Sequence, residues 1–507
     1  MLVSSLRLTS TLENLWPDTV GALPVLPDAP LTVTLDSRRL SDGDVFVAVP
    51  GVAADGRDFV AAALQAGASL VLVHGEPGET APPEPRVILL PGLRERLGEL
   101  GRELFAVPES LELVGVTGTN GKSSVTHYIA ELSQALGVPA GLVGTLGHGR
   151  PGALREGGLT TPGPLALQAA LGALAGEGVQ RVAMEVSSHA LEQGRLDGCR
   201  LAAAVFTNLT RDHLDYHGSM AAYAAAKARL FRRDELTLAV VNADDSLARL
   251  MLAGLPGGQE GRVRVLATGE DEAVTFRVID WHPHATGQRA LVATPDGERV
   301  LETALLGRFN LDNLLLAIAT LYGLGHAIGE LFDATADLAP VPGRMQALVR
   351  PGAPTVVIDY AHTPAALDNA LTALRDHLPG RGRLWCLFGC GGGRDPGKRT
   401  EMAAAAERHA DRLVVTDDNP RDEDPATIRA AVMAGLSDVA RGAALEVAGR
   451  GVAIARALAE VGDDDVVLIA GKGHETYQEV AGVRHPFSDL AEAERALNRR
   501  LAQEGAP

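Results

Sequence analysis

The chain has 507 residues, 46% of them hydrophobic, and a formal net charge of −18 at pH 7. At roughly 150 residues per domain, this length predicts about three domains, each large enough to bury a core. The acidic charge argues against a nucleic-acid surface, so an anionic ligand must be held by local lysines, arginines and helix N-termini.

The N-terminal sequence MLVSSLRLTSTLENLWPD lacks the continuous apolar segment and the cleavage site of a secretory signal. No apolar run approaches the ~18 residues that a membrane-spanning helix needs. The three cysteines, Cys199, Cys386 and Cys390, have no paired metal-ligand spacing. These features predict a soluble cytoplasmic protein with reduced thiols and no membrane insertion.

The first part of the chain, residues 1–105, is predicted to form an N-terminal domain. Residues 32–51 and 55–73 contain short strand-like runs and one helix-like run. A break in this pattern follows at the Pro-Glu-Ser sequence of residues 108–110.

Residues 113–132, LVGVTGTNGKSSVTHYIAEL, run from an apolar strand through a glycine-containing loop into a helix. Gly118 and Gly121 let the backbone turn with its N–H groups pointing inward, and a helix that starts there forms an anion site. Lys122 would neutralise the β- and γ-phosphates of a nucleotide, and the Ser123 hydroxyl would ligate Mg²⁺. The loop departs from a strict Walker A motif because Val116, not glycine, stands five positions before Gly121. A glycine turn followed by a surface lysine is the alternative, but the order of strand, loop and helix favours nucleotide binding.

Strand-like and helix-like segments alternate through a predicted central domain, residues 106–339, and a predicted C-terminal domain, residues 340–507. The strand-like runs lie at 181–186, 203–209, 238–245, 355–360, 383–389, 412–418 and 465–471. This alternation predicts βαβ units, and hence an α/β fold with mainly parallel sheets.

Polar clusters follow most of these apolar runs directly: MEVSSHA, FTNLTRDH, DYAHTP, FGCGGGRD, TDDNPRDED and AGKGHE. Ligands of open α/β sheets bind beyond the carboxyl ends of the strands. Each cluster alone could be an ordinary turn, since Asp, Asn, Gly and Pro dominate turns. Together they predict two binding edges, one in each of the last two domains, that face a shared cleft.

The motifs together resemble the Mur ligases, the ATP-dependent amino-acid ligases of peptidoglycan precursor synthesis. The similar segments are VTGTNGKSS, TTPGPL, MEVSSHAL, FTNLTRDHLDYHG, YAAAKARLF, FNLDN, PGRMQ, DYAHTP and GKGHE. They span nearly the whole chain in the family's order, and DSRRLSDGDVFVAVPG and DDNPR are similar to signatures of the members that add the third amino acid. The resemblance implies an N-terminal UDP-binding domain, a central P-loop ATPase domain and a Rossmann-like C-terminal domain that binds the amino acid.

The resemblance also implies the reaction. Such a ligase joins an amino acid to the D-Glu side-chain carboxylate of UDP-MurNAc-L-Ala-D-Glu, after ATP has converted that carboxylate to an acyl phosphate. Both transition states gather negative charge on oxygen, so catalysis should rest on Mg²⁺, cations and positioning rather than on a protein nucleophile. The expected partners are UDP-MurNAc-L-Ala-D-Glu, ATP and a diamino acid, and the expected oligomeric state is a monomer.

The resemblance assigns nucleotide and metal contacts to single residues. The expected ATP-binding residues are Gly118, Thr119, Asn120, Gly121, Lys122, Ser123, Asn310 and Arg344. Lys122 and Arg344 are also expected to act in catalysis near the phosphates. The expected Mg²⁺ ligands are Ser123, Glu185 and His213, with a catalytic role for His213 as well. In isolation Glu185 would be interpreted as an exposed carboxylate and His213 as a turn residue.

Lys227 lies in AAYAAAKARLF, an alanine-rich amphipathic helix on which a lysine is usually a solvated surface charge. By motif it corresponds to the lysine that is carbamylated in this family. N6-carboxylysine would be an anion with two oxygens, able to fix a second Mg²⁺ against the γ-phosphate. The two interpretations therefore assign opposite charges to one side chain.

The resemblance assigns the UDP-linked substrate to a further set of residues. The residues expected to bind UDP-MurNAc-dipeptide are Ser37, Thr160, Thr161, Ser187, Gln193 and Arg195. Ser37 matches the position that holds the uridine end, and the others match positions that hold the muramoyl-dipeptide.

The residues expected to bind the incoming amino acid are Arg394, Asp418, Asn419, Pro420, Arg421, Gly471 and Glu475. In this family DNPR accompanies meso-diaminopimelate, whose distal carboxylate a guanidinium can hold bidentately. A site built for that carboxylate rejects analogues that lack it. L-Lysine or L-ornithine is the alternative, for two reasons: Gly393 stands where the family has Asp, and Asp422, Glu423 and Asp424 could pair with Arg421 themselves.

Two other functions stay open at this point. Folylpolyglutamate synthase shares the phosphate loop and the ligase chemistry, but TTPGPL, DSRR and DNPR favour a Mur ligase. A P-loop switch protein would hold or hydrolyse nucleotide without a second substrate. The sequence assigns no role to His362 of DYAHTP.

Overall fold

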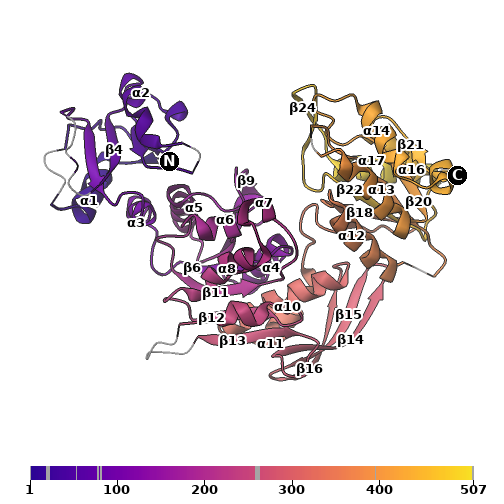
Figure 1. Cartoon of the computed structure of the whole chain (residues 1–507). Helices are drawn as coiled ribbons and strands as arrows, with labels where there is room; N and C mark the ends of the chain where they lie inside the picture. The colour runs from indigo at the N-terminus through magenta and orange to yellow at the C-terminus, as the bar shows by residue number, and fades with distance from the viewer. Residues whose placement is uncertain are drawn as a thin grey trace. The chain divides into compact units, whose positions relative to one another are not determined.

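The computed structural model describes residues 2–18, 23–52, 54–76, 79, 83–256, 263–378, 380–393 and 395–504. The chain divides into two compact units. The first unit comprises Met1–Val241 and Asp245–Val265, and the second comprises Asn242–Asp244 and Leu266–Pro507. In Figure 1 the colour runs from indigo at the start of the first unit to yellow at the end of the second.

A mainly parallel sheet with the order β1-β2-β3-β4-β5 forms the N-terminal part of the first unit. Its strands are β1 (Leu2–Val3), β2 (Leu31–Thr34), β3 (Val45–Ala48), β4 (Leu70–Gly75) and β5 (Val87–Pro91). The helices of this part are α1 (Ser5–Leu15), α2 (Val60–Gln65) and α3 (Leu97–Leu104). Every residue of β3 and β4 is buried, which explains why both strands appear in the sequence as continuous apolar runs.

The rest of the first unit is built on a sheet with the order β12-β11-β6-β10-β7-β8-β9. Its strands are β6 (Glu112–Thr117), β7 (Ala140–Gly144), β8 (Gly147–Arg150), β9 (Ala153–Arg155), β10 (Arg181–Glu185), β11 (Leu201–Phe206) and β12 (Leu238–Asn242). Its helices are α4 (Lys122–Ala135), α5 (Pro164–Gly176), α6 (Ser188–Glu192), α7 (Leu214–His217), α8 (Met220–Ala228) and α9 (Ala248–Leu252). The strands β10, β6 and β11 are parallel neighbours, with Glu185 opposite Val116 and Phe206 opposite Thr117. Their carboxyl ends therefore lie at one edge of the sheet.

Most of the next six elements, from β13 to α11, belong to the second unit, which resumes at Leu266. These elements are β13 (Arg264–Gly269), β14 (Phe276–His284), β15 (Gly287–Thr294), β16 (Gly297–Thr303), α10 (Arg308–Gly323) and α11 (Ile328–Ala334). The strands β14, β15 and β16 form an antiparallel meander.

A mainly parallel sheet with the order β17-β18-β22-β19-β20-β21 completes the second unit, with a separate hairpin of β23 and β24. The strands are β17 (Gln346–Leu348), β18 (Thr355–Asp359), β19 (Leu384–Phe388), β20 (Arg412–Val415), β21 (Leu445–Glu446), β22 (Val466–Ala470), β23 (Tyr477–Val480) and β24 (Val483–Pro486). The helices are α12 (Pro364–Asp376), α13 (Gly397–His409), α14 (Pro425–Ala434), α15 (Asp438–Ala443), α16 (Arg450–Glu460) and α17 (Asp489–Glu504).

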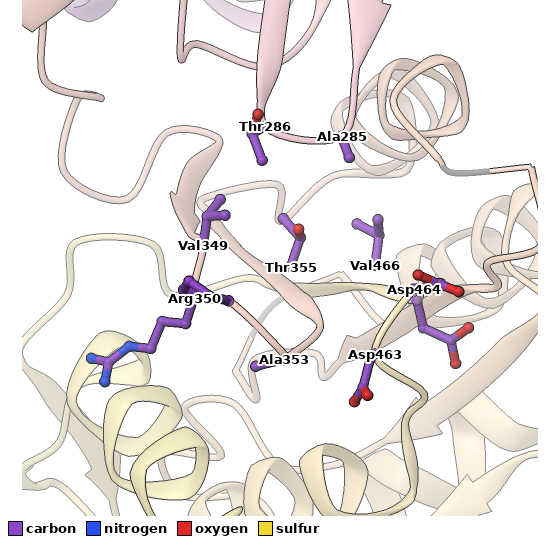
Figure 2. A pocket seen from close by; sticks show the side chains of 11 residues that line it. Ala285, Thr286, Val349, Arg350, Ala353, Thr355, Asp463, Asp464 and Val466 are labelled. Carbon is purple, nitrogen blue, oxygen red and sulfur yellow. The ribbon is translucent and has the colours of Figure 1, made fainter. Parts of the chain in front are cut away.

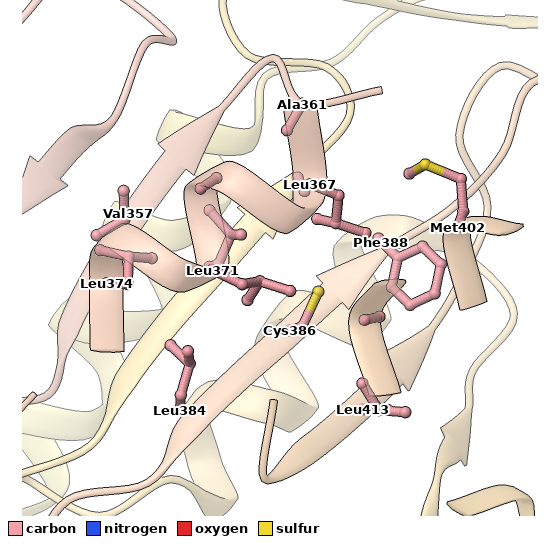
Figure 3. Packing of buried hydrophobic residues seen from close by; sticks show 14 of the residues in the cluster. Val357, Ala361, Leu367, Leu371, Leu374, Leu384, Cys386, Phe388, Met402 and Leu413 are labelled. Atoms are coloured by element: carbon pink, nitrogen blue, oxygen red, sulfur yellow. The ribbon is translucent and has the colours of Figure 1, made fainter. Parts of the chain in front are cut away.

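A hydrophobic core lies between this sheet and helices α12 and α13 (Figure 3). Leu367, Leu371 and Leu374 recur at helical spacing along α12 and are completely buried in this core. Phe388 and Cys386 of β19 contribute from the sheet. Burial raises the pKa of the Cys386 thiol, so this cysteine stays protonated and acts as a small apolar side chain.

The predicted α/β class with mainly parallel sheets is confirmed, and each predicted strand-like run contains a strand. The run at 203–209 is strand only as far as Phe206, because its last residues turn toward the loop after β6. The hairpins of β8, β14 and β23 were not predicted, because their strands are partly exposed and lack continuous apolar runs. Within the described part of the chain, no helix is long and apolar enough to cross a membrane. The domain boundaries stay a prediction.

A buried ion pair joins α16 to the start of α17. The side chains of Arg450 and Asp489 are both completely buried, and two bonds of 2.7 Å link Nε and Nη2 of Arg450 to the carboxylate. Replacing Asp489 with Ala leaves the buried Arg450 guanidinium without its carboxylate partner, so we expect the free energy of unfolding to fall by about 3–5 kcal/mol. Urea denaturation of the full chain measures this change. The control is Asp438→Ala, at a side chain that is 99% exposed, which should change stability little; equal effects of the two variants would contradict the prediction.

Candidate active site

The turn after β6 has the geometry of a phosphate loop. Gly121 has a φ of 83° and precedes α4, and Gly118 has a φ of 154°. A Cβ atom at Gly118 would collide with Oγ1 of Thr207, so only glycine fits there. The loop therefore leads directly into the N-terminus of a 14-residue helix, whose free N–H groups attract anions.

Residues that follow β11 hold this loop in position. The backbone N–H of Thr119 donates to the carbonyl of Asn208 at 2.8 Å, and the N–H of Asn120 donates to Oδ1 of Asn208 at 3.0 Å. Oγ1 of Thr207 donates to the carbonyl of Asn120 at 2.5 Å. The FTNLTRDH cluster and the phosphate loop, predicted from separate parts of the sequence, thus belong to one site.

Two lysines converge on one carbonyl group of the loop. Nζ of Lys122 donates to the carbonyl oxygens of Gly118 and Thr119, at 3.0 and 2.8 Å. Nζ of Lys227, a residue only 1% exposed, donates to the same Gly118 oxygen at 2.7 Å and lies over the Tyr223 ring. Burial, and then the nearby charge of Lys122, lower the pKa of Lys227 well below its ordinary value. The interpretation of Lys227 as a solvated surface charge is therefore wrong.

Glu185, at the end of β10, is the central carboxylate of the first unit's site. It is 2% exposed, and Oε1 accepts hydrogen bonds from Oγ of Ser123 at 2.9 Å and from the N–H of Thr145 at 2.8 Å. Its other oxygen accepts from Oγ1 of Thr145 at 3.0 Å. Adjacent oxygen ligands of octahedral Mg²⁺ stand about 3 Å apart, so the Ser123 and Glu185 oxygens fit such an ion. Among the residues described, no group of three or more His, Cys, Asp or Glu side chains is arranged to hold a metal.

His213 lies in the turn before α7 with a φ of 52°. Its Nε2 is 3.4 Å from Oδ2 of Asp212, and its ring contacts those of His189 and Tyr223. Within the described chain, no recorded contact joins His213 to Ser123 or Glu185. Its role as a metal ligand stays a prediction.

The predicted dipeptide-binding residues of the first unit form a connected network. The completely buried Thr161 accepts from the N–H of Ser187 at 3.1 Å, and its carbonyl accepts from Nη1 of Arg195 at 2.8 Å. Arg195 also donates to Oε1 of Gln193 at 2.7 and 3.0 Å. Oγ1 of Thr160 lies 3.1 Å from Oγ1 of Thr145, which links this network to Glu185. Ser37 begins a short turn, Ser37–Arg39, in the N-terminal part of the chain.

Asn310 and Arg344 belong to the second unit. Asn310 is buried in the first turn of α10 and donates from Nδ2 to the carbonyl of Leu306 at 2.8 Å. The Arg344 guanidinium lies 4.9 Å from the centre of the Tyr360 ring. Its buried Nε has no hydrogen-bond partner among the described residues. Nδ1 of His362 is 2.8 Å from the carbonyl of Tyr360.

The second unit brings most of the predicted amino-acid-binding residues together after β20 and β22. Nδ2 of Asn419 donates to Oε2 of Glu475 at 3.0 Å, and Nζ of Lys472 donates to the same oxygen at 2.9 Å. Asp418 lies 3.9 Å from Lys472, and its burial raises the pKa of its carboxyl group. Gly471 has a φ of 118°. A Cβ atom at this position would lie only 2.9 Å from Oδ2 of Asp418, so a residue with a side chain would not fit without a shift.

Arg421, after Pro420, has a φ of 52°, a backbone conformation that non-glycine residues rarely adopt. Its Nη1 donates to the carbonyl of Gly392 at 2.6 Å, and its Nε lies 3.8 Å from Oε2 of Glu479. Arg394 lies outside the described residues.

Two of the neighbouring acids that could pair with Arg421, Glu423 and Asp424, have other partners in the structure. Glu423 accepts from Nη2 of Arg399 at 2.7 Å and from the N–H of Gly393 at 2.6 Å. Asp424 caps α14 through the N–H of Ala426. Among the described residues, no recorded ion pair links Asp422 to Arg421.

Four residues that contact predicted site residues were not predicted from the sequence: Thr145, Tyr223, Lys472 and Glu479. Thr145 directly follows β7 at the same sheet edge as Glu185, and Lys472 lies within GKGHE, so strand-end position could have identified both. Tyr223 and Glu479 carry no such signal.

A cavity of about 330 Å³ lies elsewhere in the second unit, between the β14–β15 turn and the residues around β17 and β18 (Figure 2). None of the predicted site residues lines it. Asp465, at its edge, accepts from the N–H groups of Arg383 and Gly462 and from Nε1 of Trp385.

A glycine loop, two converging lysines and a serine–carboxylate pair at the carboxyl edge of a parallel sheet define a P-loop nucleotide-binding protein. Comparisons with known proteins give the family. The matching family models are "Mur ligase family, catalytic domain" over residues 32–103, "Mur ligase middle domain" over 116–321 and "Mur ligase, glutamate ligase domain" over 343–473.

The UDP-N-acetylmuramoyl-L-alanyl-D-glutamate–2,6-diaminopimelate ligase of Pseudomonas putida is 49% identical over 473 residues, which are 92% of this chain and 94% of that protein. A solved structure of an enzyme with the same name is 36% identical, with a TM-score of 0.72 and full coverage of both chains. Mycobacterium tuberculosis folylpolyglutamate synthase complexed with ADP covers 74% of this chain and 91% of its own, with 20% identity and a TM-score of 0.58, a likeness of fold alone. The chain belongs to the Mur ligase family of ATP-dependent ligases.

Proposed function

We propose that this enzyme joins meso-diaminopimelate to the D-Glu carboxylate of UDP-MurNAc-L-Ala-D-Glu, with conversion of ATP to ADP and phosphate. One observation carries the proposal: Lys122 and Lys227 donate to a single carbonyl of the loop, and Ser123, in the first turn of the helix after the loop, donates to Glu185. Cations and hard oxygen ligands at one strand edge suit phosphoryl transfer. The names of the similar ligases supply the acceptor and the amino acid.

Different residues are proposed to bind the phosphates, Mg²⁺ and the acceptor. The loop N–H groups and Lys122 would hold the β- and γ-phosphates. Ser123 and Glu185 would hold Mg²⁺, which neutralises charge on the phosphate oxygens when bound. Arg195, bonded to Thr161 and Gln193, would orient the acceptor carboxylate for attack on the γ-phosphorus, which gives an acyl phosphate and ADP. Arg344 and Asn310, which both belong to the second unit, are the remaining proposed nucleotide contacts.

Lys227 is proposed to react with carbon dioxide before catalysis. Its depressed pKa favours the neutral amine, whose lone pair attacks carbon dioxide to form an N–C bond. Loss of the amine proton to solvent leaves a carbamate anion. This anion would bind a second Mg²⁺, with His213 proposed as a further ligand on the strength of its motif.

The second half-reaction is proposed to occur with the amino acid bound between the segments after β20 and β22. Asp418, Asn419, Pro420, Arg421, Gly471 and Glu475 would form this site. The neutral α-amine of the amino acid attacks the acyl carbon, the C–O bond to phosphate breaks, and the nitrogen loses a proton to solvent as the amide forms. We further propose the domain division 1–105, 106–339 and 340–507, which the three family matches support, and a monomeric, cytoplasmic enzyme.

Release of ADP tests the proposed reaction. We expect ADP release only when UDP-MurNAc-L-Ala-D-Glu and an amino acid are both present, and fastest with meso-diaminopimelate among meso-diaminopimelate, L-lysine and L-ornithine. ADP release at the full rate with ATP alone would instead identify a nucleotide switch or a simple ATPase.

Replacing Arg421 with Ala tests the choice of amino acid. Because the guanidinium is proposed to hold the distal carboxylate, we expect kcat/KM for diaminopimelate to fall by roughly two orders of magnitude, with little change for lysine. Arg412→Ala, which removes an exposed arginine of β20, is the matched control. A wild-type preference for lysine or ornithine that survives Arg421→Ala would contradict the diaminopimelate assignment and leave the ligase assignment standing.

A further inference from the structure

We infer that Glu479 is a specificity-determining residue that binds the distal ammonium group of the incoming amino acid, beside the distal carboxylate held by Arg421. The inference rests on the proposed function, because it concerns the same amino-acid site. Neither the DNPR motif nor GKGHE contains Glu479, which lies in the β23 strand.

The backbone of Glu479 is fixed against the DNPR segment on both sides. Its N–H donates to Oδ1 of Asn419 at 3.0 Å, and its carbonyl accepts from the N–H of Arg421 at 3.0 Å. The N–H of Ala481 then donates to the carbonyl of Arg421 at 2.6 Å, which completes a parallel bridge between Arg421 and Val480. These bonds hold the two residues next to each other.

The Arg421 and Glu479 side chains approach without forming a tight pair. Nε of Arg421 lies 3.8 Å from Oε2 of Glu479, and the two side chains are 27% and 26% exposed. Nη1 of Arg421 is bonded to the carbonyl of Gly392, so the guanidinium is oriented while donors remain for a ligand. The result is a positive and a negative group side by side, both accessible from outside.

Three other charged side chains near this pair, Glu475, Glu423 and Arg484, already have contacts. Oε2 of Glu475 accepts from both Lys472 and Asn419. Glu423 is paired with Arg399. Arg484, the cross-strand neighbour of Glu479, extends over the Tyr477 ring at 4.2 Å. Of the three glutamates Glu423, Glu475 and Glu479, Glu479 is therefore the one best able to accept a new cation.

The chemistry of diaminopimelate matches this pair of charges. Its distal carbon carries a carboxylate and an ammonium group, a zwitterion of the size that a guanidinium and a carboxylate a few ångströms apart can bind. L-Lysine is the same molecule without the distal carboxylate, and L-2-aminopimelate is the same molecule without the distal ammonium. Each analogue thus keeps one of the two distal charged groups that Arg421 and Glu479 are proposed to bind.

The test measures KM and kcat for these three amino acids in wild type, Glu479→Gln and Arg421→Ala. Glu479→Gln keeps the shape and removes the charge, so we expect KM to rise roughly tenfold for diaminopimelate and lysine and to stay within about twofold for 2-aminopimelate. Arg421→Ala should raise KM for diaminopimelate and 2-aminopimelate but not for lysine. The KM for ATP should not change. Glu298→Gln, which neutralises an exposed carboxylate of β16, is the matched control.

The outcomes separate this inference from the proposed function. If Glu479→Gln raises KM equally for diaminopimelate and 2-aminopimelate, or for neither, Glu479 does not bind the ammonium group and the inference is overturned alone. A wild-type enzyme that does not ligate diaminopimelate overturns both the amino-acid assignment and this inference. A selective loss for the ammonium-bearing substrates supports it.

Discussion

Lys122→Ala is expected to lower turnover by roughly three orders of magnitude or more, because it removes the cation nearest to the proposed β- and γ-phosphates. The fold should survive, since the loop carbonyls that accept from Nζ of Lys122 can be solvated in its absence. The measurement is ADP release at saturating ATP, dipeptide and diaminopimelate, together with thermal unfolding of the same preparation.

Arg249→Ala, which removes an exposed cation of α9 in the same unit, controls for loss of charge alone. Turnover of Lys122→Ala within tenfold of wild type, with ATP saturating, would show that the loop does not hold the reacting phosphates.

Lys227→Ala is expected to abolish activity, because it removes both oxygens that the proposed carbamate supplies to a metal. Acetate or formate should restore part of that activity by supplying a carboxylate in the space left by the side chain. Lys227→Arg should be inactive as well, since a guanidinium stays protonated and cannot carry a carbamate.

The arginine variant tests whether position 227 must carry a carbamate anion or only a positive charge. Full activity of Lys227→Arg would mean that a plain positive charge suffices and that no carbamate is needed. Mass spectrometry of the intact wild-type protein, prepared with and without added bicarbonate, offers a readout that does not depend on turnover.

The fold could be predicted where buried strands appear in the sequence as continuous apolar runs. Strands β18, β19 and β22 are buried along almost their whole length, so each appears as a continuous apolar run that ends where the chain turns toward a ligand. The loop from Gly118 to Lys122 could be predicted because its glycines and its lysine are local requirements of anion binding.

The remaining site residues depend on contacts between distant segments. Helix α8 buries Tyr223, Ala224, Ala226, Lys227 and Ala228, so it has no clear polar face, and only the family resemblance singled out Lys227. Glu479 reaches Arg421 through a bridge between segments about sixty residues apart in the chain, which no local pattern records. The possible pairing of Arg421 with Glu423 could not be judged from the sequence for the same reason, because Arg399 of α13 donates to that carboxylate.

The close packing of Gly118 against Thr207 has a consequence for motion. With no room for even a methyl group between them, and with three hydrogen bonds across the gap, the phosphate loop and the turn after β11 must move as one rigid element. Adjustment to an arriving nucleotide then falls on the Lys122 side chain, whose four rotatable bonds let Nζ leave the loop carbonyls on the nanosecond scale. The amide protons of Thr119 and Asn120 should accordingly exchange with solvent slowly, and nearly as slowly without nucleotide as with it.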